Sequence, residues 1–184
     1  MHPQKSEFSP VEPVEDALII TVNDQDEVVG AKPRSTLRPN DLYRCTALFI
    51  TNPEEQLLLA RRAENKRFDP GKWSVSAAGT VEVGETYESN IIKEAEEELG
   101  LSIQNLVMGE KIKIDLDSTL FVHIFTAQIT HSETSLRLQE SEVAEAGWWS
   151  ISEIKKALRN EPDRFAKGFP RLFEAVFSKS NISS

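Results

Sequence analysis

The feature that most restricts the fold of this chain is a glutamate-rich helical pattern in the middle of the sequence. It predicts a helix from Thr86 to Leu99, because the Thr86 hydroxyl can cap the first turn and Gly100 suits the left-handed position after the last turn. An apolar stripe runs along one side of this helix and consists of Ile91, Ile92, Ala95 and Leu99. A helix with a single apolar side needs a second layer of structure to cover that side.

Three glutamates share the side of the helix next to the apolar stripe. Glu94, Glu97 and Glu98 stand at i, i+3 and i+4, so at about 100° per residue they cover about 100° of the circumference. Like charges one turn apart repel each other, and we expect Glu98 to be partly buried because it borders the stripe. A hard divalent cation with oxygen ligands, Mg²⁺ or Mn²⁺, would neutralise such a cluster. A solvated acidic helix face is the alternative, and it is the commoner origin of an acidic run.

Strand and helix patterns alternate over the rest of the chain. Short β-branched or apolar runs predict strands at 17–23, 27–31, 44–52, 56–62, 73–79, 111–117 and 120–129, and the first four form two candidate hairpins. Two further amphipathic helices are expected at 151–160 and 169–177. The sequence therefore predicts an α/β fold, with helices packed on the faces of a mixed sheet. We expect one domain over residues 16–178, between an N-terminal tail at 1–15 and a C-terminal tail at 179–184.

Composition excludes several function classes. The 184 residues suit one domain, and the net charge of −9 argues against a nucleic-acid polymer or a membrane surface as partner. The single cysteine, Cys45, rules out an internal disulfide framework and a cysteine-rich zinc site, and the histidines lack metal-ligand spacing. There is no apolar run of about 18 residues and no apolar segment near the N-terminus, so we expect a cytoplasmic protein.

The glutamate helix is part of a longer motif. The motif spans residues 79–101 and contains, at fixed spacings, Gly79, Glu85, Lys93, Glu94, Glu97, Glu98 and Gly100. This string resembles the Nudix box, the signature of the Nudix hydrolase superfamily. The resemblance implies a Nudix α/β/α sandwich with a central mixed β-sheet. It also implies that the three helix glutamates bind Mg²⁺ or Mn²⁺, assisted by the carbonyl of Gly79.

The motif departs from the Nudix pattern at one position. Lys93 stands where the pattern has arginine, and the resemblance implies that this residue pairs with Glu85 and orients the loop before the helix. A lysine keeps the positive charge but cannot make the bidentate contact of a guanidinium group. We therefore expect Glu85 to brace the loop through Lys93.

The resemblance extends beyond the motif. Residues 56–79 look like the corresponding stretch of isopentenyl-diphosphate isomerases and their hydrolase-like relatives, and residues 140–154 look like their segment after the active site. The match implies that Arg61 or Arg62, together with Lys66, binds the substrate diphosphate. A negatively charged protein that handles a polyanion needs such a local cationic group. The alternative is a pair of surface charges at the end of a strand.

Isomerase chemistry is disfavoured by the residues at the isomerase positions. The catalytic cysteine of the isomerases corresponds to Ala78 here, and two of their metal-binding histidines correspond to Tyr43 and Thr80. Their strand glutamates fall near Ser118 and Leu120. We therefore expect hydrolysis of a diphosphate linkage in a nucleoside diphosphate derivative or related nucleotide, by a metal-activated water.

The general base stays open among three glutamates. Glu94 is one candidate, and Glu142 and Glu145 are others in a predicted loop at 140–149, where plain surface charge is the alternative. A non-catalytic nucleotide-binding module is a second function, which the intact helix glutamates disfavour and Lys93 keeps open. Phe68 is the aromatic residue best placed in a loop to stack on a base, although packing is the alternative. The expected partner is a small-molecule diphosphate, and a homodimer is compatible with the resemblance.

Overall fold

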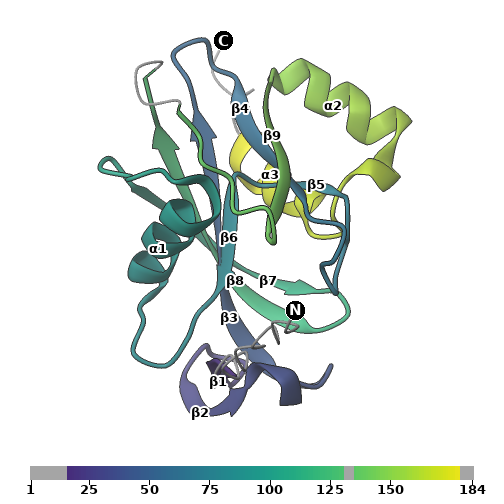
Figure 1. The fold of residues 1–184 in the computed structure, drawn as a ribbon. Helices are drawn as coiled ribbons and strands as arrows, with labels where there is room; N and C mark the ends of the chain where they lie inside the picture. Colours follow the sequence, from purple (N-terminus) through teal and green to yellow (C-terminus); the bar gives the residue numbers. More distant parts are fainter. Residues whose placement is uncertain (1–15, 131–134, 179–184) are drawn as a thin grey trace, which may run out of the picture.

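The computed structural model describes residues 16–130 and 135–178, so the expected tails at 1–15 and 179–184 lie outside the described part (Figure 1). The strands are β1 (Leu18–Val22), β2 (Val28–Pro33), β3 (Leu42–Thr51), β4 (Leu57–Arg62), β5 (Trp73–Ser74), β6 (Ala77–Thr80), β7 (Val107–Asp115), β8 (Thr119–Gln128) and β9 (Val143–Trp149). The helices are α1 (Tyr87–Leu99), α2 (Ile151–Asn160), α3 (Phe169–Phe177) and the short 3₁₀ turns η1 (Arg34–Thr36) and η3 (Pro162–Arg164). Within these ranges, no helix combines the length and the apolar character needed to cross a bilayer.

β3 is the central strand of the sheet. β8 runs parallel to it along one edge, from the pair Tyr43–Leu120 to the pair Thr51–Gln128. The other edge of β3 pairs antiparallel with three strands, β1, β6 and β4. β7 extends the sheet beyond β8, β2 extends it beyond β1, and β4 also pairs with β5 and β9. The mixed sheet and both expected hairpins, β1–β2 and β3–β4, are confirmed.

Alternating side chains of β3 and β4 build two cores, one on each face of the sheet. On one face, Phe49 packs with residues of α2 and α3, and its ring centroid is 6.2 Å from that of Phe169. On the other face, Leu48 and Leu58 join the core residues of α1, among them Ile91. Figure 1 shows α1 on one side of the sheet and α2 with α3 on the other. The expected α/β/α sandwich is confirmed.

α1 has the caps that its sequence predicts. The Thr86 hydroxyl accepts a hydrogen bond from the Ser89 N–H (3.1 Å), and the Ser89 hydroxyl accepts one from the Thr86 N–H (2.9 Å). Gly100 ends the helix with a φ of 69°. The buried side of the helix consists of Asn90, Ile91, Ala95 and Leu99. Ile92 was wrongly assigned to the apolar stripe: it is 37% exposed, because it lies about 100° around the helix from Ile91.

Two strands replace the single strand expected over 73–79. Ser76 separates β5 from β6, and its side chain is fully buried. The Ser76 hydroxyl accepts a hydrogen bond from the Ile50 N–H (2.8 Å) and donates one to the Leu58 carbonyl (2.6 Å). It therefore satisfies two backbone groups where β3 and β4 stop pairing with each other.

The segment 140–149, expected as a loop, contains strand β9. This strand pairs antiparallel with β4 from Leu57–Trp149 to Arg62–Val143. Only Val143 is buried, so the strand shows no alternation of buried and exposed side chains. Backbone pairing with β4 forms it, and the side-chain pattern gave no signal for that pairing.

Candidate active site

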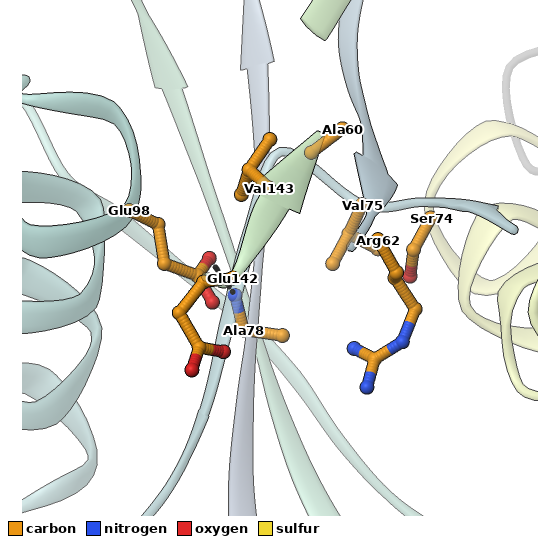
Figure 2. Close-up of a pocket in the computed structure, with 8 residues that line it drawn as sticks. All are labelled: Ala60, Arg62, Ser74, Val75, Ala78, Glu98, Glu142 and Val143. Atoms are coloured by element: carbon orange, nitrogen blue, oxygen red, sulfur yellow. Dashed lines mark hydrogen bonds between the residues drawn. The ribbon is translucent and has the colours of Figure 1, made fainter. Parts of the chain in front are cut away.

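α1 and β6 bring two of the motif glutamates to the same place. The Glu98 carboxylate accepts a hydrogen bond from the Ala78 backbone N–H at 3.3 Å (Figure 2). The Glu94 side chain lies directly against Gly79, where a Cβ atom would collide with the Glu94 carboxyl group. Glycine at position 79 therefore allows the helix carboxylate to approach the strand backbone closely.

Burial and repulsion from neighbouring carboxylates raise the pKa values of both carboxyl groups. The pKa of Glu98 rises to about 8, mainly because burial disfavours its charge and also because Glu94 is close. The pKa of Glu94 rises to about 7, again mainly through burial; the Lys93 charge opposes this rise and the Glu97 charge adds to it. These are the groups whose charged form a divalent cation would stabilise most.

The third motif glutamate is placed differently. Glu97 is exposed on α1, whereas Glu94 and Glu98 are partly buried. In the part of the chain that the structure describes, no three His, Cys, Asp or Glu side chains are grouped tightly enough to hold a metal ion. Carboxylate oxygens are the ligands that a hard divalent cation prefers, but the Glu97 side chain would have to turn toward Glu94 for all three motif glutamates to bind one cation.

The loop before α1 is held by the expected pair of charges. The Lys93 Nζ atom lies 2.5 Å from Glu85 Oε1 and 3.6 Å from Glu82 Oε1. Glu85 also accepts hydrogen bonds from the Glu82 N–H and from the Asn90 side chain, both at 2.9 Å. Burial opposes the charge of Glu85, yet the contact with Lys93 and, after it, these two hydrogen bonds hold the pKa of Glu85 below the ordinary value. Lys93 thus reaches Glu85 with a single ammonium group.

Asn90 is a site residue that the sequence reasoning missed. It is fully buried on α1, and its amide group donates hydrogen bonds to the Thr80 carbonyl (3.2 Å), to Glu85 and to Glu94 Oε1 (3.4 Å). Its oxygen accepts a hydrogen bond from the Thr46 hydroxyl at 2.5 Å. A polar residue four positions before Glu94 on the apolar side of the helix was the available signal.

The structure separates the two arginines that the sequence left as alternatives. Arg62 lines a small pocket together with Ala60, Ser74, Val75, Ala78, Glu98, Glu142 and Val143. Figure 2 shows Arg62 on one side of this pocket, opposite Glu98 and Glu142. Arg61 is the neighbouring strand residue and pairs instead with Glu145 (3.1 Å) and Glu64 (2.9 Å). Arg62 is therefore the arginine next to the motif glutamates.

Two further predicted residues meet at the same pocket. Lys66 forms an ion pair with Glu142, the acidic residue that faces Glu98 in Figure 2. Arg62 donates a hydrogen bond through Nε to the Phe68 carbonyl at 3.0 Å, which ties the loop after β4 to the pocket. Phe68 itself is 47% exposed and belongs to neither core cluster. Glu142 is thus better placed than Glu145 to act on a group bound beside Glu98.

The isomerase positions lie on the side of β6 away from Glu94. Cys45 is opposite Thr80 in the β3–β6 pair, and its Sγ atom is 3.9 Å from the Thr80 hydroxyl oxygen. Burial raises the pKa of the Cys45 thiol to about 12, although the hydrogen bond with Thr80 opposes the rise. Such a thiol neither ionises near neutral pH nor delivers a proton readily, which agrees with a structural role.

The comparisons with known proteins fit this geometry. A model of the NUDIX domain matches residues 42–169. That range is more than half of the chain, so the chain belongs to the Nudix domain family. An uncharacterised Nudix hydrolase of Pseudomonas aeruginosa is 36% identical over 133 residues, which are 70% of this chain and 76% of that protein.

Two other relatives carry names from prenyl-diphosphate chemistry. An isopentenyl-diphosphate Delta-isomerase of an Enterobacter strain is 29% identical over 157 residues, covering 80% of this chain and 84% of that protein. A prenyl-diphosphate phosphatase of Methanosarcina mazei is 26% identical over 161 residues, covering 86% of this chain and 92% of that protein. The resemblance to the isomerase branch of the Nudix superfamily is thus confirmed.

Solved structures confirm the fold. A Deinococcus radiodurans protein superimposes with a TM-score of 0.72 at 22% identity, covering 86% of this chain and 99% of that one. The NUDIX domain of Shewanella oneidensis NrtR, solved in complex with ADP-ribose, gives a TM-score of 0.60 at 13% identity, with 80% of this chain and 92% of that one covered. At these identities the likeness establishes the Nudix fold.

Proposed function

We propose that this protein hydrolyses a diphosphate linkage in a nucleoside diphosphate derivative or related nucleotide, with Mg²⁺ or Mn²⁺ as cofactor. The observation that carries the proposal is the meeting of Glu94 and Glu98 at β6, with Arg62 across the same pocket. Carboxylates that favour a cation, facing a guanidinium group that favours an anion, suit a metal-bound diphosphate. Kinship with a Nudix hydrolase and a prenyl-diphosphate phosphatase supports diphosphate chemistry.

Each residue of the site has its own role in the proposed hydrolysis. Glu94, Glu98 and the Gly79 carbonyl would hold the cation, with Glu97 turned inward as a further ligand. A cation held by these groups would supply charge neutralisation at the diphosphate and would lower the pKa of the attacking water. Arg62 orients the diphosphate, and Glu142 accepts the proton of the water as its oxygen bonds to phosphorus and the bridging P–O bond breaks.

Replacement of the motif carboxylates Glu94 and Glu98 tests the proposal. Glu98→Gln and Glu94→Gln should each lower turnover by at least about a hundredfold, because a neutral amide cannot replace a carboxylate ligand. Glu96→Gln is the matched control, since Glu96 is an exposed glutamate of the same helix. The assay is phosphate release from nucleoside diphosphates, dinucleotides, nucleotide sugars and isopentenyl diphosphate, with alkaline phosphatase added to reveal organic products.

The outcomes separate the proposal from its rivals. EDTA-sensitive turnover of a nucleotide, lost in Glu94→Gln and Glu98→Gln and kept in Glu96→Gln, supports it. Full turnover by Glu98→Gln in Mg²⁺ would remove the assignment of the site. Nucleotide binding without turnover on any substrate would favour a non-catalytic module, and conversion of isopentenyl diphosphate to its isomer would restore the isomerase.

A further inference from the structure

The side-chain amide of Asn90 lies between two carboxylates that belong to different parts of the motif. Asn90 is fully buried on α1. Its amide nitrogen lies 2.9 Å from Glu85 Oε2 and 3.4 Å from Glu94 Oε1. Glu85 braces the loop before the helix, whereas Glu94 belongs to the proposed cation site. One neutral side chain therefore connects the loop brace with a proposed metal ligand.

The neighbours of Asn90 determine which way its amide group faces. One end of the group lies next to the Thr80 carbonyl (3.2 Å) and the two carboxylates, and all three are hydrogen-bond acceptors. The NH₂ group must occupy that end, because it has two donors and no acceptor. The oxygen at the other end accepts a hydrogen bond from the buried Thr46 hydroxyl at 2.5 Å. β3 thus fixes Asn90, and Asn90 fixes the carboxylates.

Glu94 depends on Asn90 for a defined orientation. Among the hydrogen bonds found within residues 16–130 and 135–178, the one that reaches the Glu94 carboxylate comes from Asn90. The rest of the Glu94 side chain lies against Gly79, which offers no side-chain donor. A terminal carboxylate torsion is broad unless a contact selects one orientation. The amide of Asn90 supplies that contact from inside the protein.

A neutral donor suits this position better than a cationic one. Lys93 is next to Glu94 in the sequence, but its ammonium group pairs with Glu85 at 2.5 Å, and no ion pair with Glu94 is found within the described residues. An ammonium group on Glu94 would compensate the negative charge that a divalent cation needs. The amide of Asn90 orients Glu94 without supplying a charge, and it also holds Glu85, the partner of the ammonium group.

We infer that Asn90 is a positioning residue for the divalent cation, because it holds the Glu94 carboxylate in the orientation that binds Mg²⁺ or Mn²⁺. The inference rests on the proposed function, since it takes Glu94 as a ligand of that cation. Removal of a hydrogen-bond partner of a metal ligand typically weakens metal binding by 10–100-fold. The alternative is a buried polar residue that only stabilises the packing of α1 on the sheet.

The test measures the affinity for Mn²⁺, which does not require turnover. The electron paramagnetic resonance signal of free Mn²⁺ gives the Kd, and Asn90→Ala should raise it by about 10–100-fold. Thr46→Val keeps the amide group but removes the donor that fixes its oxygen, so a smaller rise is expected. Asn52→Ala is the matched control, since Asn52 is 2% exposed and makes two hydrogen bonds with Gln56 in the β3–β4 turn.

Two further measurements separate positioning from a purely structural role. Urea unfolding in EDTA should show a loss of stability in both Asn90→Ala and Asn52→Ala, because each substitution removes a buried amide and leaves its partners unsatisfied. Only Asn90→Ala should weaken Mn²⁺ binding. In a Glu94→Gln background, Asn90→Ala should add less than about a threefold change in the Kd of Mn²⁺, because Asn90 acts through Glu94.

The outcomes distinguish this inference from the proposed function. An unchanged Kd in folded Asn90→Ala, or an equal rise in Asn52→Ala, would overturn the inference and leave the cation site in place. If Asn90→Ala does not fold, Thr46→Val decides, and a Kd equal to that of the wild type would overturn the inference. If the wild type binds no Mn²⁺, the cofactor of the proposed function is wrong and the inference fails with it.

Discussion

Glu98 combines a structural and a chemical role in one side chain. It completes the contact between α1 and β6 through the Ala78 N–H, and it lines the pocket opposite Arg62. Its burial and the nearby Glu94 favour the neutral form of the carboxyl group in the folded protein. Without a bound cation, ionisation of Glu98 therefore works against the fold.

This property predicts an unusual dependence of stability on pH. The pKa of Glu98 is about 8 in the fold, against 4.5 for the model carboxyl group. The folded state then holds more protons than the unfolded state, so the free energy of unfolding falls as pH rises through this window. The slope from one group is at most about 1.4 kcal/mol per pH unit. Urea unfolding in EDTA, repeated across the window, measures it.

The matched variant isolates the contribution of this group. Glu98→Gln should flatten the fall in unfolding free energy between these pH values, because the amide does not titrate. Mg²⁺ should have a similar effect on the wild type if it binds the ionised carboxylates. Identical pH profiles for the wild type and the variant in EDTA would refute the role given to Glu98.

Single residues show how far the sequence could define the site. The spacing of Glu94, Glu97 and Glu98 was enough to predict a shared helix side and the partial burial of Glu98. It could not separate Arg61 from Arg62, because that choice depends on which side of β4 each residue faces and on the carboxylates nearby. The exposed position of Glu97 depends on side-chain rotation, which spacing does not determine.

At the scale of elements, Ser76 explains why the sheet forks. β3 pairs with β4 at Ile50 and Thr51, and with β6 earlier in the strand, from Cys45 to Leu48. Neighbouring backbone groups therefore lose their strand partners where the pairing changes. The Ser76 hydroxyl supplies partners to Ile50 and Leu58 at that point. The fork allows β6, with Gly79, to lie beside α1 while β4, with Arg62, lines the other side of the pocket.

Loss of the Ser76 hydroxyl group should lower the free energy of unfolding of the domain. Ser76→Ala leaves a buried N–H and a buried carbonyl with one partner fewer, which costs about 1–3 kcal/mol of unfolding free energy. Ser102→Ala is the control, because Ser102 is exposed in a loop after α1 and should change stability by less than about 0.5 kcal/mol. Chemical unfolding measures both, and an equal effect of the two substitutions would contradict the role of Ser76.

The elements themselves were largely predictable, with informative exceptions. α1, α2 and α3 follow from caps and apolar periodicity, and the hairpins β1–β2 and β3–β4 from paired apolar runs. The break at Ser76 was missed because a serine in an apolar run carries no visible stop signal. β9 was missed because its strand character comes from pairing with β4, between residues about 80 to 90 positions apart in the sequence.

At the scale of the whole molecule, one carboxylate joins parts that are distant in the sequence. Asp26 lies in the β1–β2 turn, and its side chain is 4% exposed. It accepts hydrogen bonds from Arg44 of β3 (2.8 Å), from Tyr87 of α1 (3.2 Å) and from Lys111 of β7. The first hairpin is thereby attached to the helix that carries the motif glutamates.

Asp26→Asn should be among the more destabilising single changes. It removes the negative charge of a buried carboxylate and leaves the partly buried Arg44 and the more exposed Lys111 without their partner, at a cost on the order of 3 kcal/mol. Asp24→Asn in the same turn is the matched control, since Asp24 is 70% exposed where it pairs with Lys113, and a change below about 1 kcal/mol is expected. Thermal and urea unfolding of the two variants provide the comparison, and similar losses would contradict the role of Asp26.

The contact between Gly79 and Glu94 has a consequence for how this chain can vary. The Glu94 side chain occupies the space that a Cβ atom at position 79 would need. A side chain at position 79 therefore competes with a long side chain at position 94. A library that randomises both positions and selects for folding should yield alanine or serine at 79 only together with a shortened residue at 94. Selection for a glutamate at 94 should return glycine at 79 almost without exception. Substitutions at these two positions, fifteen residues apart, should therefore depend on each other.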